Sequence, residues 1–163
     1  MKTCDALIVG GGPAGSSCAR KLSQHGLDVI VMDKAVFPRD KVCAGWITPE
    51  VVKALELDVH EYAQTRAFQP ITAFRTGLVG GETLETRYPA PVSYGIRRCE
   101  FDDYLLQRSG AQPWLGQTLK SMERDGNRWA VNDSLSTPLI IGAGGHFCPV
   151  ARYLGAKLGA EEA

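Results

Sequence analysis

Three glycines that follow a short apolar run constrain the fold of this chain more than any other feature. The run at residues 7–9 is typical of a buried parallel strand. Gly10, Gly12 and Gly15 come directly after it with the spacing G-x-G-x-x-G. In this pattern Gly10 allows a tight turn, Gly12 leaves room for a pyrophosphate, and Gly15 lets the next helix lie close to the strand. The spacing therefore predicts a strand, a turn and a helix that together bind a dinucleotide.

The segment after the glycines continues the same pattern. A helix predicted at 13–25, with Pro13 and Ala14 in its first turn, points its free N–H groups and its positive end at the phosphates. A second apolar run at 29–32 predicts another parallel strand, and this run ends at Asp33. The distance along the chain from the glycines to Asp33 is close to that of a carboxylate that binds ribose.

The identity of the nucleotide is limited by Asp33. Its negative charge would repel a 2′-phosphate on the bound ribose, so the ligand is predicted to be FAD or NAD rather than NADP. The glycine spacing by itself is weak, because a glycine-rich turn that binds nothing has the same spacing. The complete set from strand to acid is much more specific, and the prediction of dinucleotide binding depends on that set.

Composition and charge exclude several other classes of protein. Of the 163 residues, 18 are Lys or Arg and 18 are Asp or Glu, so no basic field attracts nucleic acid or anionic lipid. No apolar run approaches the length of a membrane span, and no signal peptide is recognised. The five cysteines contain no C-x-x-C pair, and the three histidines share no ligand spacing with them, so no metal site is predicted. We expect a cytoplasmic protein.

The segment after the second strand departs from a simple nucleotide-binding domain. Residues 34–46 are too long and too irregular for a minimal crossover between parallel strands. Thr48 is then the predicted N-cap of a short helix that buries Val51 and Val52. An NAD-binding domain would instead continue directly into another crossover helix.

An antiparallel insertion is predicted at 66–96. Within it, strands at 71–79 and 82–88 face each other across Gly80 and Gly81, a natural two-residue turn. The chain then returns to the parallel sheet through a helix and further apolar runs. The predicted fold class is therefore α/β, a Rossmann-like parallel sheet that binds FAD or NAD(P), with an antiparallel β insertion.

The predicted domains follow from this order. Residues 1–65 and 97–163 form the Rossmann-like dinucleotide-binding domain, and 66–96 form a β-rich insertion that is part of a substrate domain. A parallel sheet needs cover on both faces. Because only the helices predicted at 13–25 and 99–109 are long enough to supply it, we expect part of the sheet to lack cover.

Four patterns together carry a resemblance to a known family. They are the glycine motif with Asp33, the loop P-R-x-K-x-C-A-G at 38–45, the run I-R-R-C-E-F-D-x-x-L at 96–105, and G-A-G-G at 142–145 followed by V-A-R at 150–152. In these patterns the chain resembles the N-terminal half of FAD-dependent oxidoreductases of the para-hydroxybenzoate hydroxylase fold. Among them it is most similar to the geranylgeranyl reductase-related subgroup.

The resemblance implies specific contacts with FAD. Arg39 would form a charge-assisted contact with the pyrophosphate, Arg98 would contact the flavin, and Cys43 would lie on the substrate side of the flavin. No catalytic residue is assigned. The predicted cofactor-binding residues are Gly10, Gly12, Pro13, Ala14, Gly15, Asp33, Lys34, Arg39, Cys43, Ala44, Gly45, Arg98 and Gly142.

The activity that the resemblance implies is that of an FAD-dependent oxidoreductase. It would be a reductase or a monooxygenase that acts on a small or prenyl-type organic substrate, with NAD(P)H as a candidate electron donor. The flavin would carry the redox chemistry, and the protein would bind and orient it. Two alternatives remain open, a non-catalytic dinucleotide-binding remnant and an NAD-binding enzyme domain.

Family members are considerably longer than this chain. We therefore expect either a fragment of a larger enzyme or a natural truncation, in which the flavin site is incomplete. Apolar surface that a missing half would cover weakens the fold and favours contacts between copies of the chain. We accordingly expect self-association and weak or absent redox activity.

Overall fold

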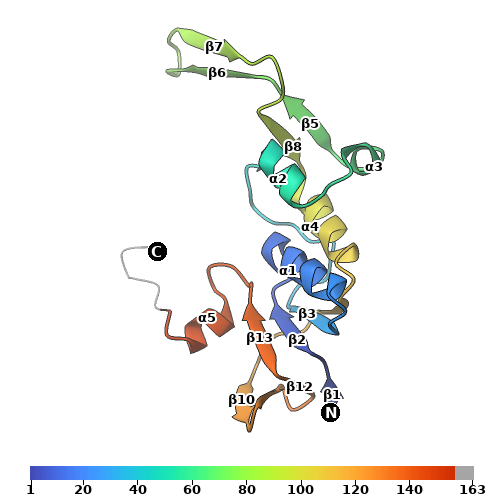
Figure 1. Ribbon diagram of the computed structural model, residues 1–163. Coiled ribbons are helices and arrows are strands. Elements are labelled where there is room, and N and C mark those ends of the chain that lie inside the picture. Colours follow the sequence, from blue (N-terminus) through green and yellow to red (C-terminus); the bar gives the residue numbers. More distant parts are fainter. Residues whose placement is uncertain (157–163) are drawn as a thin grey trace. The chain divides into compact units, whose positions relative to one another are not determined.

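The computed structural model describes the chain up to Ala156, and the fold consists of two compact units (Figure 1). The first unit contains Met1–Arg39 and the described residues from Asp102 onward, and the second contains Asp40–Phe101. In the described part, the helices are α1 (Pro13–Gln24), α2 (Pro49–Ala54), α3 (Val59–Ala63), α4 (Arg98–Gln107) and α5 (Pro149–Tyr153). The strands are β1 (Lys2–Thr3), β2 (Ala6–Val9), β3 (Val29–Asp33), β4 (Trp46–Ile47), β5 (Phe68–Ile71), β6 (Ala73–Gly77), β7 (Thr83–Arg87), β8 (Ser93–Ile96), β9 (Gln112–Leu115), β10 (Met122–Asp125), β11 (Arg128–Val131), β12 (Leu135–Thr137) and β13 (Leu139–Gly142).

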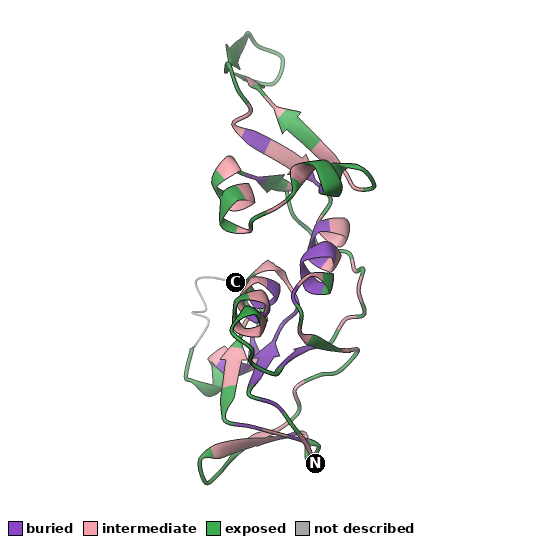
Figure 2. Cartoon of the chain, turned by 45° about the vertical axis from the view of Figure 1, so that its right-hand side comes forward, coloured by how far each residue is buried: buried purple, intermediate pink, exposed green. Residues whose placement is uncertain are grey.

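The first unit is built on a parallel sheet with the strand order β13-β2-β3-β9. The run at residues 7–9 forms its centre, because β2 pairs in parallel with both β13 and β3. This pairing places Ile8 beside Ile141 on one side and Val31 on the other. The predicted order of strand, helix and second strand is confirmed by β2, α1 and β3, and Figure 2 shows these two strands largely buried.

One face of this sheet is covered by helices, as the sequence predicts. Ile8 and Val31 are fully buried on this face, where Ala19 of α1 and Leu106 of α4 pack against them. Successive residues of a strand point to opposite faces, so the neighbours of these residues belong to the other side of the sheet. The apolar side chains of β2 therefore point alternately to the two faces of the sheet, and every residue of the strand is buried.

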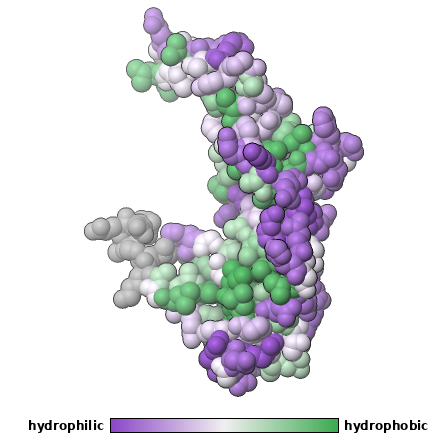
Figure 3. All heavy atoms as spheres, viewed as in Figure 1, coloured by the Kyte–Doolittle hydropathy of each residue, from purple (hydrophilic) through white to green (hydrophobic). Residues whose placement is uncertain are grey.

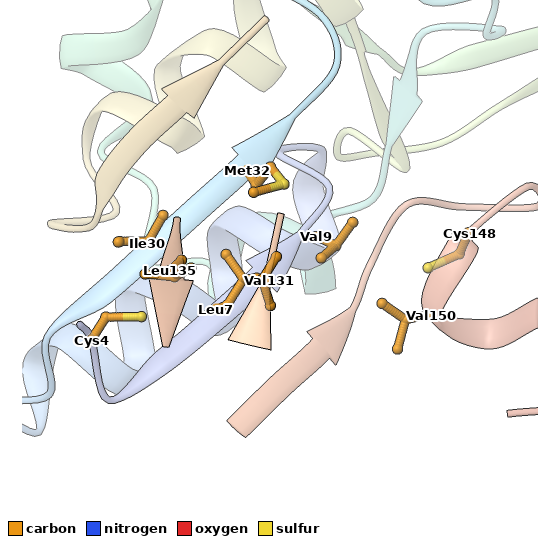
Figure 4. Packing of buried hydrophobic residues seen from close by; sticks show 9 residues of the cluster. All are labelled: Cys4, Leu7, Val9, Ile30, Met32, Val131, Leu135, Cys148 and Val150. Atoms are coloured by element: carbon orange, nitrogen blue, oxygen red, sulfur yellow. The ribbon is translucent and has the colours of Figure 1, made fainter. Parts of the chain in front are cut away.

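The other face is covered by a second sheet and not by helices. This sheet has the order β1-β12-β11-β10, and it presents Val131 and Leu135 to Leu7, Ile30 and Met32 of the parallel strands (Figure 4). All five side chains are at most 1% exposed. The expectation that this part of the sheet lacks cover is therefore wrong, because a small antiparallel sheet supplies the apolar layer that helices usually provide.

One local prediction in the second unit is confirmed and one is wrong. Thr48 is the N-cap of α2, as predicted, although its side chain makes no capping hydrogen bond. None of the residues of α2 is buried, and Val51 and Val52 are only half-buried. The fully buried side chain of this region is Tyr62 of α3, which packs edge-on against Phe68 at 5.9 Å between ring centroids. The short α2 helix thus lies at the surface because α3 fills the core beside β5.

The hairpin of the second unit has a longer loop than the sequence predicts. The register of β6 and β7 pairs Gly77 with Thr83, so five residues separate the strands instead of two. Inside this loop the N–H of Gly81 donates to the carbonyl of Leu78 at 3.0 Å. The wider loop therefore shifts the pairing of β6 with β7 by one residue relative to the expected hairpin. The side chains of one strand then lie on the opposite face of the ribbon relative to those of the other strand.

The second unit is wider than the predicted insertion at 66–96. β4 pairs with β8, which joins Trp46 and Ile47 to the antiparallel sheet β4-β8-β5. In addition, the backbone N–H of Ala67 donates to the carboxylate of Glu100 at 2.8 Å. These contacts extend the compact unit on both sides of the β-rich segment.

Up to Ala156, none of the helices is both long enough and apolar enough to cross a membrane.

Candidate functional site

The three motif glycines fill the positions for which the sequence pattern selects glycine. Gly10 has φ +118°, and a Cβ there would overlap the backbone of Ala143 at the end of β13. A Cβ on Gly15 would overlap the carbonyl oxygen of Gly10, so α1 lies directly against the turn. A Cβ on Gly12 would meet only Arg39, with Nη2 at 3.5 Å. Among the three, Gly12 is thus the position with open space in front of it.

The start of α1 lies at this open space. Gly12 is the N-cap and has no side chain to accept from the first N–H groups, Pro13 occupies the first turn, and that turn contains no acidic residue. The N-terminal N–H groups and the positive end of the helix dipole therefore lack a side-chain acceptor and a counter-charge in the first turn. This arrangement suits a phosphate group. We call residues 10–15 the glycine loop.

Asp33 ends β3 beside the glycine loop. Its Oδ2 accepts a hydrogen bond from the N–H of Gly11 at 2.7 Å, and its Oδ1 accepts one from the N–H of Ala35 at 2.9 Å. The two bonds fix the carboxylate in one orientation. Because each carboxylate oxygen can accept more than one hydrogen bond, Asp33 can still accept from ribose hydroxyls.

Arg39 reaches the glycine loop from the segment that follows β3. Its Nη2 forms an ion pair at 3.2 Å with Asp102, a residue of α4 that is 0% exposed. The guanidinium lies 4.7 Å from the ring centroid of Phe37, which is a cation–π contact. The ring of Phe37 in turn lies 3.1 Å from the position of a Cβ on Gly11. Phe37 and Asp102 thus hold Arg39 next to Gly12.

Sequence reasoning missed Asp102 as a functional residue, although the sequence contains a signal for it. Asp102, Leu105 and Leu106 have the spacing of one helix face, and all three are buried. An acid on an otherwise apolar stripe predicts a buried cation from another segment. The sequence could not tell which of the 18 Lys and Arg residues supplies that cation.

Four of the predicted site residues, Cys43, Ala44, Gly45 and Arg98, belong to the second unit. Cys43 and Ala44 are exposed, and the Sγ of Cys43 accepts from the N–H of Gly45 at 3.4 Å. Gly45 has φ +73° and packs against the backbone of Ile96. Arg98 is half-buried at the first position of α4. Their contacts with a cofactor stay predictions.

Two predicted residues of the first unit have simple surroundings. Lys34 is exposed directly after Asp33. Gly142 ends β13, and a Cβ there would come within 2.9 Å of both Cys148 and Val150, the residues that Figure 4 shows beside each other at the start of α5. The close packing of α5 therefore explains this glycine without a ligand. A role in cofactor binding stays a prediction for both residues.

The cysteines differ strongly in their surroundings. Burial raises the pKa of the Cys4 thiol above its usual range, which disfavours the reactive thiolate. Cys43 is exposed. Over the described residues, no group of three or more His, Cys, Asp or Glu side chains is arranged to hold a metal ion.

Comparison with known proteins shows related sequences. Residues 5–77 match the family model described as FAD dependent oxidoreductase. Menaquinone reductase from Mycobacterium tuberculosis is 32% identical over 169 residues, which cover 95% of this chain and 41% of that protein. Geranylgeranyl diphosphate reductase from Rhodobacter capsulatus is 30% identical over 157 residues, which cover 86% of this chain and 37% of that protein. The chain thus spans about two fifths of the length of these relatives.

Solved structures show the same fold. A probable FAD-dependent monooxygenase from Pseudomonas aeruginosa, pqsL, has a TM-score of 0.77 at 20% identity, over 96% of this chain and 47% of that one. A geranylgeranyl bacteriochlorophyll reductase-like protein from Thermoplasma acidophilum has a TM-score of 0.72 at 20% identity, over 96% of this chain and 43% of that one. The halogenase PltM, solved in complex with phloroglucinol and FAD, also has a TM-score of 0.72 at 20% identity, over 96% of this chain and 37% of that one.

Proposed function

Because the chain belongs to the family of FAD-dependent oxidoreductases, we propose that it binds FAD at the glycine loop and serves the reduction or hydroxylation of an organic substrate. The observation that carries the proposal is the open space at Gly12, which adjoins the start of α1 and the guanidinium of Arg39. Asp33 is hydrogen-bonded to the same loop. Backbone N–H donors, a cation and a carboxylate thus lie together at the glycine loop.

Each of these groups has a distinct role toward FAD in this proposal. The N–H groups at the start of α1 bind the pyrophosphate, Arg39 neutralises part of its charge, and Asp33 accepts from the adenosine ribose. Bound FAD supplies the redox chemistry, and the chain binds and orients it. The names of the two reductase relatives support a small or prenyl-type organic substrate. We propose NAD(P)H as the electron donor.

Titration of the purified chain with FAD, NAD⁺ and NADP⁺ tests the proposed function. We expect FAD to bind most tightly, with quenching of the flavin fluorescence and a yellow protein after dialysis. Tighter binding of NAD⁺ than of FAD would instead support an NAD-binding domain. If FAD binds but added NAD(P)H and substrate analogues never change the flavin absorbance, the non-catalytic alternative is favoured.

Asp33→Ala is expected to weaken FAD binding by roughly ten- to a hundredfold, because a contact between a carboxylate and ribose hydroxyls contributes about 1.5–3 kcal/mol. The measurement is a fluorescence titration of FAD. Asp28→Ala is the matched control: Asp28 precedes β3 at its other end, and it should leave the affinity unchanged, since ligands bind at the carboxyl ends of parallel strands. Asp33→Asn is a milder change, because its amide oxygen still accepts from one backbone N–H. If Asp33→Ala, Asp33→Asn and Asp28→Ala all bind FAD with the same affinity, Asp33 does not belong to the site.

A cytoplasmic location is also part of the proposal. All five cysteines, Cys4, Cys18, Cys43, Cys99 and Cys148, lie in the described part of the chain, and none forms a disulfide. Thiols that include an exposed one stay reduced in a reducing compartment. This chemistry supports the cytoplasm as the location of the protein.

We also propose that the chain self-associates through β13 and α5. In the described part of the chain, β13 pairs on one edge only, and parallel strands are normally buried. Four apolar side chains near it are exposed by 46–77%, namely Leu139, Phe147, Tyr153 and Leu154. Figure 3 shows hydrophobic residues gathered over this region. An unpaired edge beside exposed apolar side chains favours contacts between chains.

Sedimentation velocity tests this proposal. We expect the chain to form dimers or larger species at micromolar concentration, and a chain with Phe147→Glu and Leu154→Glu to sediment as a monomer, because association would bury two unpaired charges. A chain with Leu78→Glu and Val79→Glu carries the same charges on the exposed hairpin loop and should associate like the unsubstituted chain. A monomeric unsubstituted chain would contradict self-association.

A further inference from the structure

A fully buried acid and an arginine of the candidate site form a pair whose purpose the fold alone does not explain. The carboxylate of Asp102 is 0% exposed, and Nη2 of Arg39 lies 3.2 Å from it. The side chain of Arg39 is 18% exposed, and Arg39 is the last residue of the stretch Met1–Arg39 of the first unit. A buried ion pair is weak evidence for stability, since desolvation of both charges offsets their attraction. Stability alone therefore does not account for the pair, and Arg39, its less buried member, lies beside Gly12.

The donors of Arg39 indicate an absent acceptor. A guanidinium carries five N–H donors in a fixed planar arrangement. Nη2 faces Asp102 and lies 3.5 Å from where a Cβ of Gly12 would be. Nη1 is buried, and within the described residues it has no hydrogen-bond partner. Because buried donors normally have partners, an unpaired Nη1 on the guanidinium whose Nη2 lies beside Gly12 indicates an acceptor that arrives with a ligand.

We infer that Asp102 is a positioning residue of the phosphate site, which holds the guanidinium of Arg39 beside the glycine loop so that its remaining donors face a phosphate of the ligand. The inference rests on the proposed binding of a dinucleotide. An arginine on a loop loses many rotamers when it binds a phosphate, and an arginine that Asp102 and Phe37 already fix loses few. Asp102 thus strengthens phosphate binding without touching the ligand.

A comparison of ADP with adenosine isolates this effect. Both ligands carry the ribose that Asp33 is proposed to bind, and only ADP carries the diphosphate. The phosphate increment is the ratio of the dissociation constant of adenosine to that of ADP, each measured by calorimetric titration of the same chain. We expect Asp102→Asn to lower this increment about tenfold while the affinity for adenosine changes by less than about twofold.

Three further variants separate positioning from a purely structural role. In the Arg39→Gln background, Asp102→Asn should change the increment no further, because the residue through which it acts is gone. Asp102→Glu keeps the charge but moves the carboxylate by one methylene, and it should also lower the increment; it serves if Asp102→Asn fails to fold. Asp103→Asn is the matched control on the same helix. The carboxylate of Asp103 accepts a hydrogen bond from Nε2 of Gln107 at 2.6 Å.

The outcomes distinguish this inference from the proposed function. If the unsubstituted chain binds neither FAD nor ADP, the proposed function is wrong and the inference falls with it. If the unsubstituted chain binds ADP more tightly than adenosine, but Asp102→Asn and Asp102→Glu keep the full increment, the inference alone is wrong. Equal losses for ADP and adenosine would assign Asp102 a structural role only and would also overturn it.

Discussion

Gly12→Val is expected to abolish measurable FAD binding while the chain keeps its fold. The valine side chain would project into the open space that is proposed to receive the pyrophosphate, next to Nη2 of Arg39. Loss of the contacts to both phosphates should weaken binding at least about a hundredfold, which corresponds to about 2.7 kcal/mol. Fluorescence titration with FAD measures the loss.

The fold should tolerate this substitution for two reasons. Gly12 has φ −71°, so a residue with a Cβ meets no backbone strain, and the nearest atom is the end of a flexible side chain. Valine is a poorer N-cap than glycine, which costs about 1 kcal/mol of unfolding free energy at most. Gly81→Val places the same side chain on the loop of the β6–β7 hairpin and should bind FAD normally. Normal FAD stoichiometry in the Gly12→Val chain would show that the glycine loop does not face the ligand.

Gly15→Ala is expected to destabilise the first unit strongly, although it adds one methyl group only. The new Cβ would overlap the carbonyl oxygen of Gly10 and approach Cγ2 of Ile8 to 3.2 Å. Both neighbours belong to the buried centre of the unit, so α1 must move away from β2. Overpacking of this kind costs about 3 kcal/mol, a large fraction of the 5–15 kcal/mol of a typical domain.

Chemical denaturation followed by circular dichroism measures this effect. Gly12→Ala is the matched control, because it is the same chemical change three positions earlier in open space, and it should lower the unfolding free energy by about 1 kcal/mol at most. The higher helix propensity of alanine favours Gly15→Ala by up to about 1 kcal/mol, so it opposes the expected loss of stability and cannot be its cause. Equal stability of the two variants would show that α1 does not pack against Gly10 as described.

The sequence by itself determined the part of the fold that is local. Residues 7–9, the glycines, the α1 helix and Asp33 follow one another within a short segment, and their spacing has a direct physical meaning. The structure confirms β2, α1 and β3 in this order, with Gly10 at φ +118° as the turn requires. The position of Asp33 at the end of β3 is also as predicted. These features needed no knowledge of distant residues.

The cover of the sheet was decided by the tertiary structure. The expectation about cover considered only helices long enough to cover the sheet. β12 has three residues and is too short to be recognised from its sequence pattern. Its Leu135 is nevertheless fully buried, because β12 lies between β1 and β11 in a sheet that joins the first residues of the chain to a late segment. The loop of the β6–β7 hairpin is similar: Gly80 and Gly81 predict a turn, but pairing of the whole strands sets the register.

The candidate site shows the same division. Gly12 and Asp33 are recognisable from their spacing, whereas the partner of Arg39 lies far along the chain on α4. An acid at position 102 on an apolar helix face indicates that some cation must reach it, and only folding brings Arg39 to that place. Local spacing therefore specifies the loop that is proposed to bind the phosphates. The ion pair beside it depends on long-range packing, and residue types alone do not tell which distant residues come close together.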